Sequence, residues 1–293
     1  MLRQDQMDPC LWATQTRSFM PVGAVKTVHH LNCGSFTPWR GLSLVTHVLL
    51  CEMEHGLLLV DVGTGIDDAF SPTFRLGHSP RLAGAHLAPG ESALHQLKKL
   101  GFASSDVTDI VTTHLDYDHV GGLADFQSAR LHTTATELIE ARKPALTRGG
   151  RIRYRPAHTE TIRNAVTYSI FNDTVLGLKA AEVSGTSGVF LAPTPGHTIG
   201  HAAVAVLDPV RGWLVHAGDA FLNQASIHPH APKRLSDCAI QAVEMLLATD
   251  RAQVRKNHSQ FRDLAASGVR VFCSHDAAQL EALQKETHLV ASV

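Results

Sequence analysis

The sequence has few cysteines, no long apolar run and almost no net charge. Its five cysteines in 293 residues are scattered and form no Cys-x-x-Cys pair, so we predict a reducing, cytoplasmic environment. No apolar stretch is long enough to span a bilayer, and the first ten residues carry acids where a secretory leader would be apolar. A net charge of −1 gives no electrostatic reason to expect a nucleic acid or an anionic membrane as partner.

The composition is that of an ordinary globular chain, with an unusual number of histidines. Apolar residues make up 44% and charged residues 18%, and the chain can bury a large core without disulfide bonds. We interpret residues 1–25 as an N-terminal arm, and residues 26–293 as a single domain with an irregular insertion at about 136–186. The 19 histidines prompt a search for metal ligands.

Strand and helix patterns alternate in both halves of the chain. Strands are predicted over 26–31, 43–53, 57–62, 106–113, 188–192, 201–207, 213–216 and 269–273. Helices are predicted over 91–100, 234–248, 251–266 and 277–285, with Leu235 and Leu246 on the inward face of the second. This order favours an α/β sandwich of mixed sheets over a doubly wound parallel sheet. No Gly-x-Gly-x-x-Gly follows a strand, so a dinucleotide-binding fold has no support.

One loop concentrates potential metal ligands. His114, Asp116, Asp118 and His119 fall within six residues, after a predicted strand and before a short predicted helix. Imidazole and carboxylate groups are the usual protein ligands for zinc and for divalent iron or manganese. Capping the helix would require one such residue and not four, so metal binding is the better interpretation.

Three further loops supply complementary side chains. His197 lies in a Pro-Gly-His-Thr turn, Asp219 in a Gly-Asp turn and His275 in a Ser-His-Asp turn, each after a predicted strand. Because all four loops leave strand ends, we expect them to converge on one edge of the sandwich. The histidines inside predicted strands are interpreted as structural, among them His30, His47 and His216.

These motifs together resemble the metallo-β-lactamase superfamily, from about Asp61 to His275, and are most similar to its N-acyl homoserine lactonase-like hydrolases. The resemblance implies an αββα sandwich of two mixed β-sheets flanked by helices. It implies these ligands: His114, Asp116 and His197 for one metal, Asp118, His119 and His275 for the second, and Asp219 as the bridge. Asp61 matches an early acid of the superfamily that is expected to orient a loop or a ligand.

The implied cofactors are two divalent metal ions, with zinc preferred and iron or manganese as alternatives. Such a pair makes a bridging hydroxide available near neutral pH. The expected function is therefore metal-dependent hydrolysis of a carboxylic ester, with a lactone preferred as the small-molecule substrate and Asp118 as the catalytic proton shuttle. Phosphodiester, organophosphate and thioester hydrolysis are alternatives, an iron-dependent oxidoreductase ranks below them, and a homodimer is left open.

Two departures from the family pattern concern the substrate and the metals. The commonest motif has histidine where this chain has Asp116, and the lactonases have a tyrosine three residues after the bridging acid, where this chain has Leu222. Tyr117 and Tyr154 are candidates to replace that missing donor. The segment 142–155 carries six basic residues and no acid. We interpret it as a solvated loop, with a flap that meets an anionic substrate as the alternative.

Overall fold

The computed structural model describes residues 23–40, 42–78, 83–143, 148–228 and 234–291, so the predicted arm lies almost entirely outside the described residues. One sheet has the order β4-β1-β2-β3-β5-β6-β7 and the other β13-β12-β11-β10-β9-β8. The strands of the first are Val25–Phe36 (β1), Leu44–Met53 (β2), Leu57–Val60 (β3), Ala85–His86 (β4), Val107–Val111 (β5), Arg130–Thr134 (β6) and Ala165–Tyr168 (β7). Those of the second are Asp173–Val175 (β8), Leu178–Glu182 (β9), Val189–Pro193 (β10), Ala202–Asp208 (β11), Gly212–His216 (β12) and Arg270–Phe272 (β13).

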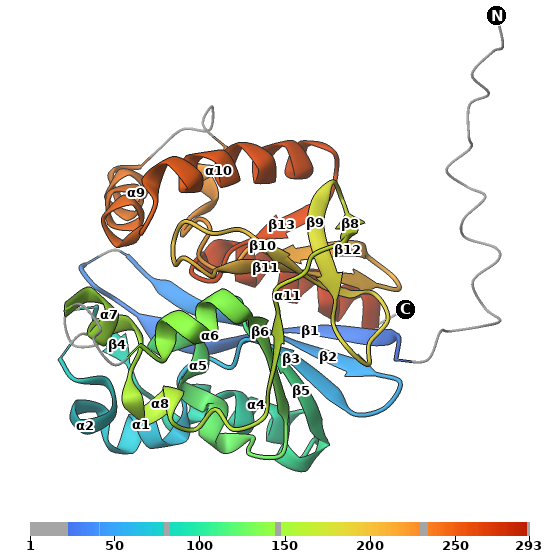
Figure 1. Ribbon diagram of the computed structural model, residues 1–293, viewed down its shortest axis with the longest axis horizontal. Coiled ribbons are helices and arrows are strands. Elements are labelled where there is room, and N and C mark those ends of the chain that lie inside the picture. Colours follow the sequence, from blue (N-terminus) through green and yellow to red (C-terminus); the bar gives the residue numbers. More distant parts are fainter. Residues whose placement is uncertain (1–22, 41, 79–82, 144–147, 229–233, 292–293) are drawn as a thin grey trace, which may run out of the picture.

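Helices cover the outer faces of both sheets (Figure 1). Those that follow strands of the first sheet are Ile66–Phe70 (α1), Pro72–Leu76 (α2), Ala93–Lys99 (α4), Tyr117–Val120 (α5), Ala135–Ala141 (α6), Arg148–Arg153 (α7) and Pro156–Thr159 (α8). The later helices are Leu235–Leu247 (α9), Arg251–Ala266 (α10) and Ala277–Ala291 (α11). This is the αββα sandwich of two mixed sheets that the sequence predicts. Within the described part of the chain, no helix is long and apolar enough to cross a membrane.

The period-two alternation of apolar residues explains the layers. In β2, Leu49 and Cys51 enter the core between the two sheets, whereas Val48 and Leu50 join the core beneath the first sheet, which includes Leu97 of α4. Successive strand residues point to opposite faces, so a strand that is apolar at every position must be covered on both sides. Each fully buried side chain of this size contributes about 1.5–3 kcal/mol relative to exposure.

The predicted inward face of α9 is wrong. Leu235 is 92% exposed and Leu246 73% exposed, while Ile240 and Glu244 are buried. The Glu244 carboxylate accepts hydrogen bonds from the backbone N–H of Leu222 (2.8 Å) and from the hydroxyl of Ser226 (3.1 Å). A buried acid therefore helps to fix the orientation of this helix, which a search for apolar periodicity does not detect.

The segment 136–186 contains more regular structure than the sequence indicates. It includes most of α6 and all of α7 and α8, then β7, which extends the first sheet, and β8 and β9, which extend the second. These strands are short, and β7 has no fully buried residue, so no alternation marks them in the sequence. The division into one arm and one domain stays a prediction.

Candidate metal centre

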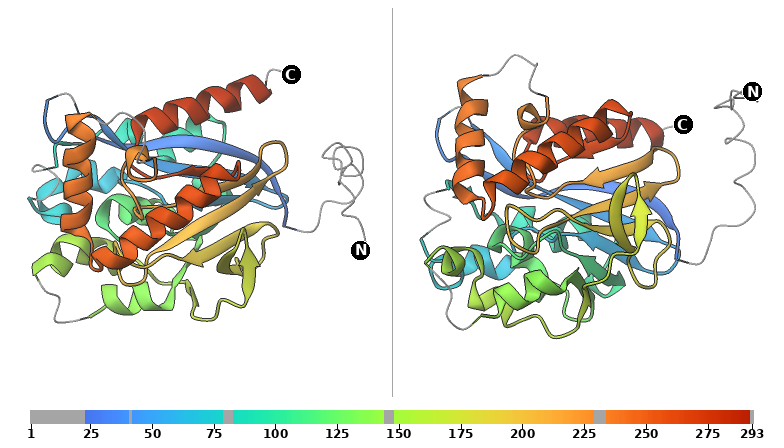
Figure 2. Two further views of the ribbon diagram at one scale, coloured as in Figure 1. Left: turned by 90° about the horizontal axis from the view of Figure 1, so that it is seen from above. Right: turned by 45° about the horizontal axis from the view of Figure 1, so that its top comes forward.

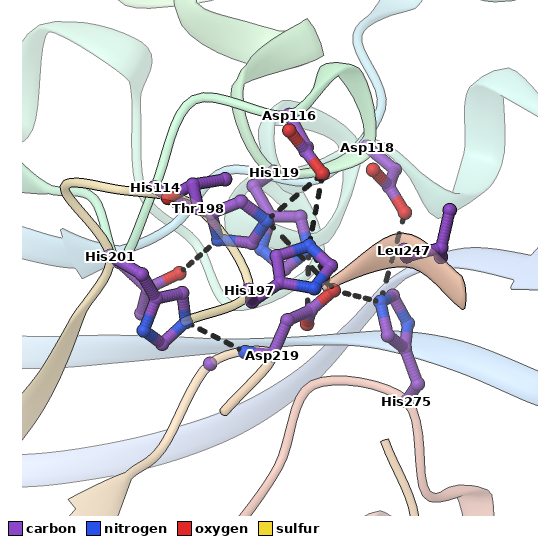
Figure 3. A network of polar contacts seen from close by, with 12 residues as sticks. His114, Asp116, Asp118, His119, His197, Thr198, His201, Asp219, Leu247 and His275 are labelled. Atoms are coloured by element: carbon purple, nitrogen blue, oxygen red, sulfur yellow. Dashed lines mark hydrogen bonds and ion pairs between the residues drawn. The ribbon is translucent and has the colours of Figure 1, made fainter. Parts of the chain in front are cut away.

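The predicted ligands lie just beyond the ends of four strands. His114 follows β5, His197 follows β10, Asp219 follows β12 and His275 follows β13. Strands β12 and β13 are parallel, and β10 runs in the same direction as β12 because both pair antiparallel with β11. Their carboxyl ends therefore open at one edge of the second sheet, and Figure 3 shows the side chains converging there with those of the β5 loop.

The first ligand set consists of His114, His197 and Asp219, whose ligand atoms all lie within 4.8 Å of one another. The Asp219 Oδ2 atom is 3.8 Å from His114 Nε2 and 3.5 Å from His197 Nε2. Asp116 Oδ2 adjoins the set, 3.5 Å from His114 Nε2 and 3.1 Å from His197 Nε2. Ligands roughly 2.1 Å from a tetrahedral zinc ion are about 3.4 Å apart, so these spacings suit a single ion.

The second ligand set consists of Asp118, His119 and His275, again within 4.8 Å of one another. Asp219 also borders this set, because its Oδ1 lies 3.4 Å from His119 Nε2 and its Oδ2 lies 3.1 Å from His275 Nε2. One buried carboxylate thus faces both sets. That placement is typical of an acid that bridges two cations.

Several ligand atoms are buried without a hydrogen-bond partner, which tests whether the residues fit metal ions. They are His114 Nε2, Asp116 Oδ1, His119 Nε2 and Asp219 Oδ1. Buried polar atoms in folded proteins rarely lack a partner, and a bound cation would satisfy these lone pairs. The donors are imidazole and carboxylate groups, the set preferred by zinc, iron and manganese. The residues therefore fit divalent metal ions.

The pKa values of Asp219 and of the second-set histidines, His119 and His275, favour opposite charges on these groups. Burial would raise the pKa of Asp219, but His275 and His119 outweigh burial and keep that pKa well below its usual range. Burial likewise opposes the charged form of His275, yet the Asp219 carboxylate raises the pKa of His275 to about 9. Metal binding must displace these protons from the histidines, so proton release accompanies it.

Asp61 orients one of the ligands. Its Oδ2 accepts hydrogen bonds from His119 Nδ1 (2.8 Å) and from the Thr113 hydroxyl (2.9 Å), and its Oδ1 accepts one from the Thr113 backbone N–H (2.8 Å). The proton on Nδ1 leaves His119 Nε2 free for the site. Carboxylates in this position fix the tautomer and angle of metal-binding histidines, which is the role expected from the sequence.

His201 holds the loop that carries Asp219, a role that the sequence does not reveal. Its Nε2 accepts from the Asp219 backbone N–H at 3.0 Å, and its Nδ1 lies 3.1 Å from the Thr194 carbonyl oxygen. Gly218 precedes Asp219 with φ +55°, and a Cβ there would lie 2.6 Å from His201 Nε2. Both backbone conformation and space therefore require glycine at this turn.

Glu137 is a second residue that sequence reasoning missed. Its buried carboxylate accepts from Leu115 N (3.0 Å), the Tyr154 hydroxyl (3.1 Å), the Thr198 hydroxyl (2.7 Å) and Gly200 N (3.1 Å). These contacts tie the loop of His114 to the loop of His197. The available signal, an acid three residues after a helix-capping threonine, indicates only a helix start.

The two candidate tyrosines differ in the structure. The Tyr154 hydroxyl is used by Glu137, so it is not a free donor. Tyr117 lies between Asp116 and Asp118 in the chain. Burial, followed by the charges of Asp118 and Asp116, raises the pKa of Tyr117 well above its usual value, so its phenol stays protonated. Tyr117 thus remains a candidate donor.

The solvated-loop interpretation of segment 142–155 requires its basic side chains to lie in solvent. Arg153 does not, because only 13% of its side chain is exposed. Arg153 Nη1 donates to Asp116 Oδ2 at 2.6 Å and to His197 Nε2 at 2.9 Å. Burial opposes the charge of Arg153, but Asp116 outweighs burial and raises the pKa of Arg153. One guanidinium of the segment therefore reaches the first ligand set.

Comparisons with known proteins agree with this geometry. Residues 44–275 match the metallo-beta-lactamase superfamily. The chain is 38% identical over 255 residues to a probable metallo-hydrolase of Mycobacterium tuberculosis, covering 85% of this chain and 80% of the relative. It is 25% identical over 220 residues to the N-acyl homoserine lactonase AiiA of Bacillus thuringiensis subsp. kurstaki, covering 73% and 79%.

A solved structure shares the fold. It is an N-acyl homoserine lactone hydrolase with the product N-hexanoyl-L-homoserine bound at its catalytic metal centre. The TM-score is 0.66 at 20% identity, covering 88% of this chain and 96% of that one. The chain belongs to the metallo-beta-lactamase superfamily. It is an enzyme, a metallo-hydrolase that uses divalent metal ions.

Proposed function

We propose that the protein hydrolyses a carboxylic ester, with a lactone as the preferred substrate, at a site for two divalent metal ions. The observation that carries the proposal is the position of Asp219, one buried carboxylate within 3.5 Å of ligand atoms from both sets. The relative and the solved structure that act on acyl homoserine lactones support this substrate class. Zinc is the preferred metal because imidazoles outnumber carboxylates among the ligands.

The residues of the chain divide the remaining work. Bound at this site, the two ions supply an activated water and polarise the ester carbonyl. Asp118, whose side chain is 15% exposed, accepts a proton and passes it to the leaving alkoxide. The protonated phenol of Tyr117 donates a hydrogen bond to the substrate carbonyl, in place of the tyrosine that is missing after Asp219. Asp61, His201 and Glu137 hold the ligands in position.

Phosphoester hydrolysis is the second candidate, and one observation favours it. The guanidinium of Arg153 lies at the first ligand set, where it could pair with a phosphate oxygen. A carboxylic ester remains preferred, because that guanidinium is already paired with Asp116 at 2.6 Å.

The test compares four substrates on one metal-loaded preparation: a lactone, an aryl ester, a glutathione thioester and a phosphoester. We expect the lactone or the aryl ester to give the highest kcat/KM, a chelator to abolish turnover and added zinc to restore it. A phosphoester preference above about tenfold, or about 1.4 kcal/mol of transition-state free energy, would overturn the ester assignment. A fully loaded protein that holds one ion per chain would contradict the two-metal site.

A further inference from the structure

Arg153 occupies a position that the proposed hydrolysis does not explain. It is the last residue of α7, and only 13% of its side chain is exposed. Its Nη1 contacts two atoms of the first ligand region, Asp116 Oδ2 and His197 Nε2. Its Nη2 donates to the carbonyl oxygen of Leu247, at the end of α9. A fixed positive charge therefore lies where a metal ion is expected.

This placement is particular to Arg153 among the described side chains of the basic segment. Arg142 and Arg155 each donate to a backbone carbonyl oxygen at 3.0 Å, and Lys143 pairs with Glu140. None of those three contacts involves a predicted ligand. Figure 2 shows α7 and α9 at the same end of the molecule, where the hydrogen bond from Arg153 to the Leu247 carbonyl links them.

The hydrogen bond to His197 excludes a metal ion at the same atom. A neutral imidazole nitrogen that lacks a proton has one lone pair in the plane of the ring. In the tautomer with its proton on Nδ1, His197 Nε2 accepts from Arg153 Nη1 at 2.9 Å with the one lone pair that a metal ion at the first set requires. The two bonds therefore cannot exist together. In the other tautomer, Nε2 carries the proton and donates to Asp116 Oδ2 at 3.1 Å, so that proton must leave before a metal ion can bind.

Among the described residues, the second ligand set has no competing cationic side chain; its histidines, whose pKa values are raised, release protons to solution when a metal ion binds. Over the ranges that the structure describes, no lysine or arginine forms an ion pair with Asp118, and the polar partners of the His119 and His275 rings are carboxylates and a backbone oxygen. The two sets therefore differ in what a metal ion displaces, which is protons at the second set and the guanidinium of Arg153 at the first.

The charge of the site gives a reason for the pairing. Asp116 stands where the commonest family motif has a neutral histidine, so this chain carries one additional negative charge beside the first set. Arg153 neutralises that charge at 2.6 Å when no cation is near. A divalent ion would take over this role and leave Arg153 without its partner.

We propose that Arg153 and a divalent metal ion exchange at the first ligand set, so that this set loads second and more weakly. The inference rests on the proposed two-metal function. Displacement of Arg153 also breaks its hydrogen bond to the Leu247 carbonyl, which loosens α7 against α9. Metal loading is thereby coupled to the mobility of α7.

The experiment titrates metal-free protein with Zn²⁺ in competition with a chelating indicator dye. We expect two binding phases in the wild type, separated by at least about tenfold in affinity. Arg153→Met removes the charge and keeps most of the side-chain length, so the weaker phase should tighten by about tenfold or more and the two phases should approach each other. Arg142→Met is the matched control from the same segment and should leave both phases unchanged.

A weaker phase that is unchanged or weakened in Arg153→Met would overturn the exchange, as would an equal shift in the Arg142 control. A second measurement needs no variant. Amide hydrogen exchange of residues 148–153 in the wild type should speed up at least severalfold between the metal-free and the loaded protein, and unchanged exchange contradicts the proposal. Neither readout depends on turnover, so a failure of the ester assignment would appear in the substrate comparison alone, whereas one ion per fully loaded chain would contradict the two-metal site itself.

Discussion

Two groups of buried histidines lie close together in this fold and behave in opposite ways. At the strand ends, His119 and His275 face carboxylates, and the pKa of each is raised despite burial. The inter-sheet cluster of His30, His47 and His216 packs around Phe272, and none of the three rings has a carboxylate partner among the residues that the structure describes. Burial lowers the pKa of all three.

The difference shows that acids, and not the number of histidines, distinguish a metal site from a core. His30 Nε2 accepts from Arg211 Nη1 at 3.1 Å, and its Nδ1 lies 2.8 Å from His47 Nε2, so its polar neighbours are a cation and a second histidine. Its pKa falls to about 3 because of burial, with a further contribution from Arg211. A histidine in such surroundings packs as an aromatic group with two polar atoms, whereas one beside Asp219 competes for protons and cations.

The strongest test of this contrast removes the acid that both ligand sets share. Asp219→Ala should reduce kcat/KM at least a thousandfold, or about 4 kcal/mol, and weaken metal binding at both sets because one carboxylate serves two cations. Folding of the metal-free protein should survive, since the large core does not depend on metal. Steady-state rates, metal content and a thermal unfolding curve measure the three effects.

A matched control is Asp208→Asn, which alters a buried acid at the opposite end of the β11–β12 hairpin, paired with Arg211 at 2.6 Å. It should lower stability and leave kcat/KM near the wild-type value. Near-normal turnover in Asp219→Ala would show that Asp219 is not the bridge.

A second variant removes an acid that contacts a predicted metal ligand and leaves the ligand itself unchanged. Asp61→Asn removes the charge that orients His119, and we expect about 10–100-fold lower zinc affinity at the second set, the usual effect of such partners. Competition with a chelating dye measures it. His30→Gln, in the inter-sheet cluster, is the comparison variant and should leave zinc affinity unchanged; equal losses in both variants would contradict an orienting role for Asp61.

The inter-sheet cluster predicts a pH dependence of stability. The pKa of His30 is about 3 in the folded protein against 6.5 for the free side chain, so the unfolded chain binds more protons between these values. Stability from this residue is present above pH 6.5 and lost as the pH falls toward 3. In chelator-treated protein, His30→Gln should reduce the slope of the unfolding free energy against pH by up to about 1.4 kcal/mol per pH unit in this window. Urea titrations at pH 7, 6 and 5 give the unfolding free energy at each pH. The same dependence on pH in the wild type and in His30→Gln would refute the prediction.

The smallest expected effect concerns Tyr117, the candidate hydrogen-bond donor between Asp116 and Asp118 in the chain. Tyr117→Phe should lower kcat by about tenfold, with metal content unchanged, because a single neutral hydrogen bond to the reacting carbonyl is lost. Turnover and metal analysis on the same preparation check it. Full activity in the variant would remove Tyr117 from the mechanism and leave the metals as the sole carbonyl activators.

Much of the fold could be predicted from patterns that burial itself creates. The run Ala202–Asp208 and its partner Gly212–His216 alternate between two covered faces, and Arg251–Ala266 is a helix with the predicted bounds. The strands Ala165–Tyr168 and Asp173–Val175 escaped notice because they are short edge strands with a single buried residue, Val175, between them. The strand-end motifs let us name beforehand the four histidines that face the Asp219 carboxylate, but not His201, which accepts from the Asp219 backbone N–H.

The residues that hold the predicted ligands in place could not be named from the sequence, because their roles depend on contacts between residues distant in the chain. Glu137 lies 61 residues from Thr198, and the spacing around it has a local explanation as a helix start. Arg153 is one of six similar basic residues, and only its contacts with Asp116, His197 and the Leu247 carbonyl distinguish it. Local spacing therefore predicts which groups can bind a metal, but not which groups hold them in place.

The four hydrogen bonds of Glu137 have a consequence for engineering. Loop exchange between related hydrolases is a natural way to alter substrate choice, and residues 136–186 would be an obvious block to transplant. Removal of Glu137 with that block would leave the buried donors of Leu115, Thr198 and Gly200 without an acceptor, at about 1–3 kcal/mol each. A functional graft should therefore begin after Glu137 and keep a tyrosine at position 154. The recipient then retains the hydrogen bonds of Glu137 that connect the two ligand loops.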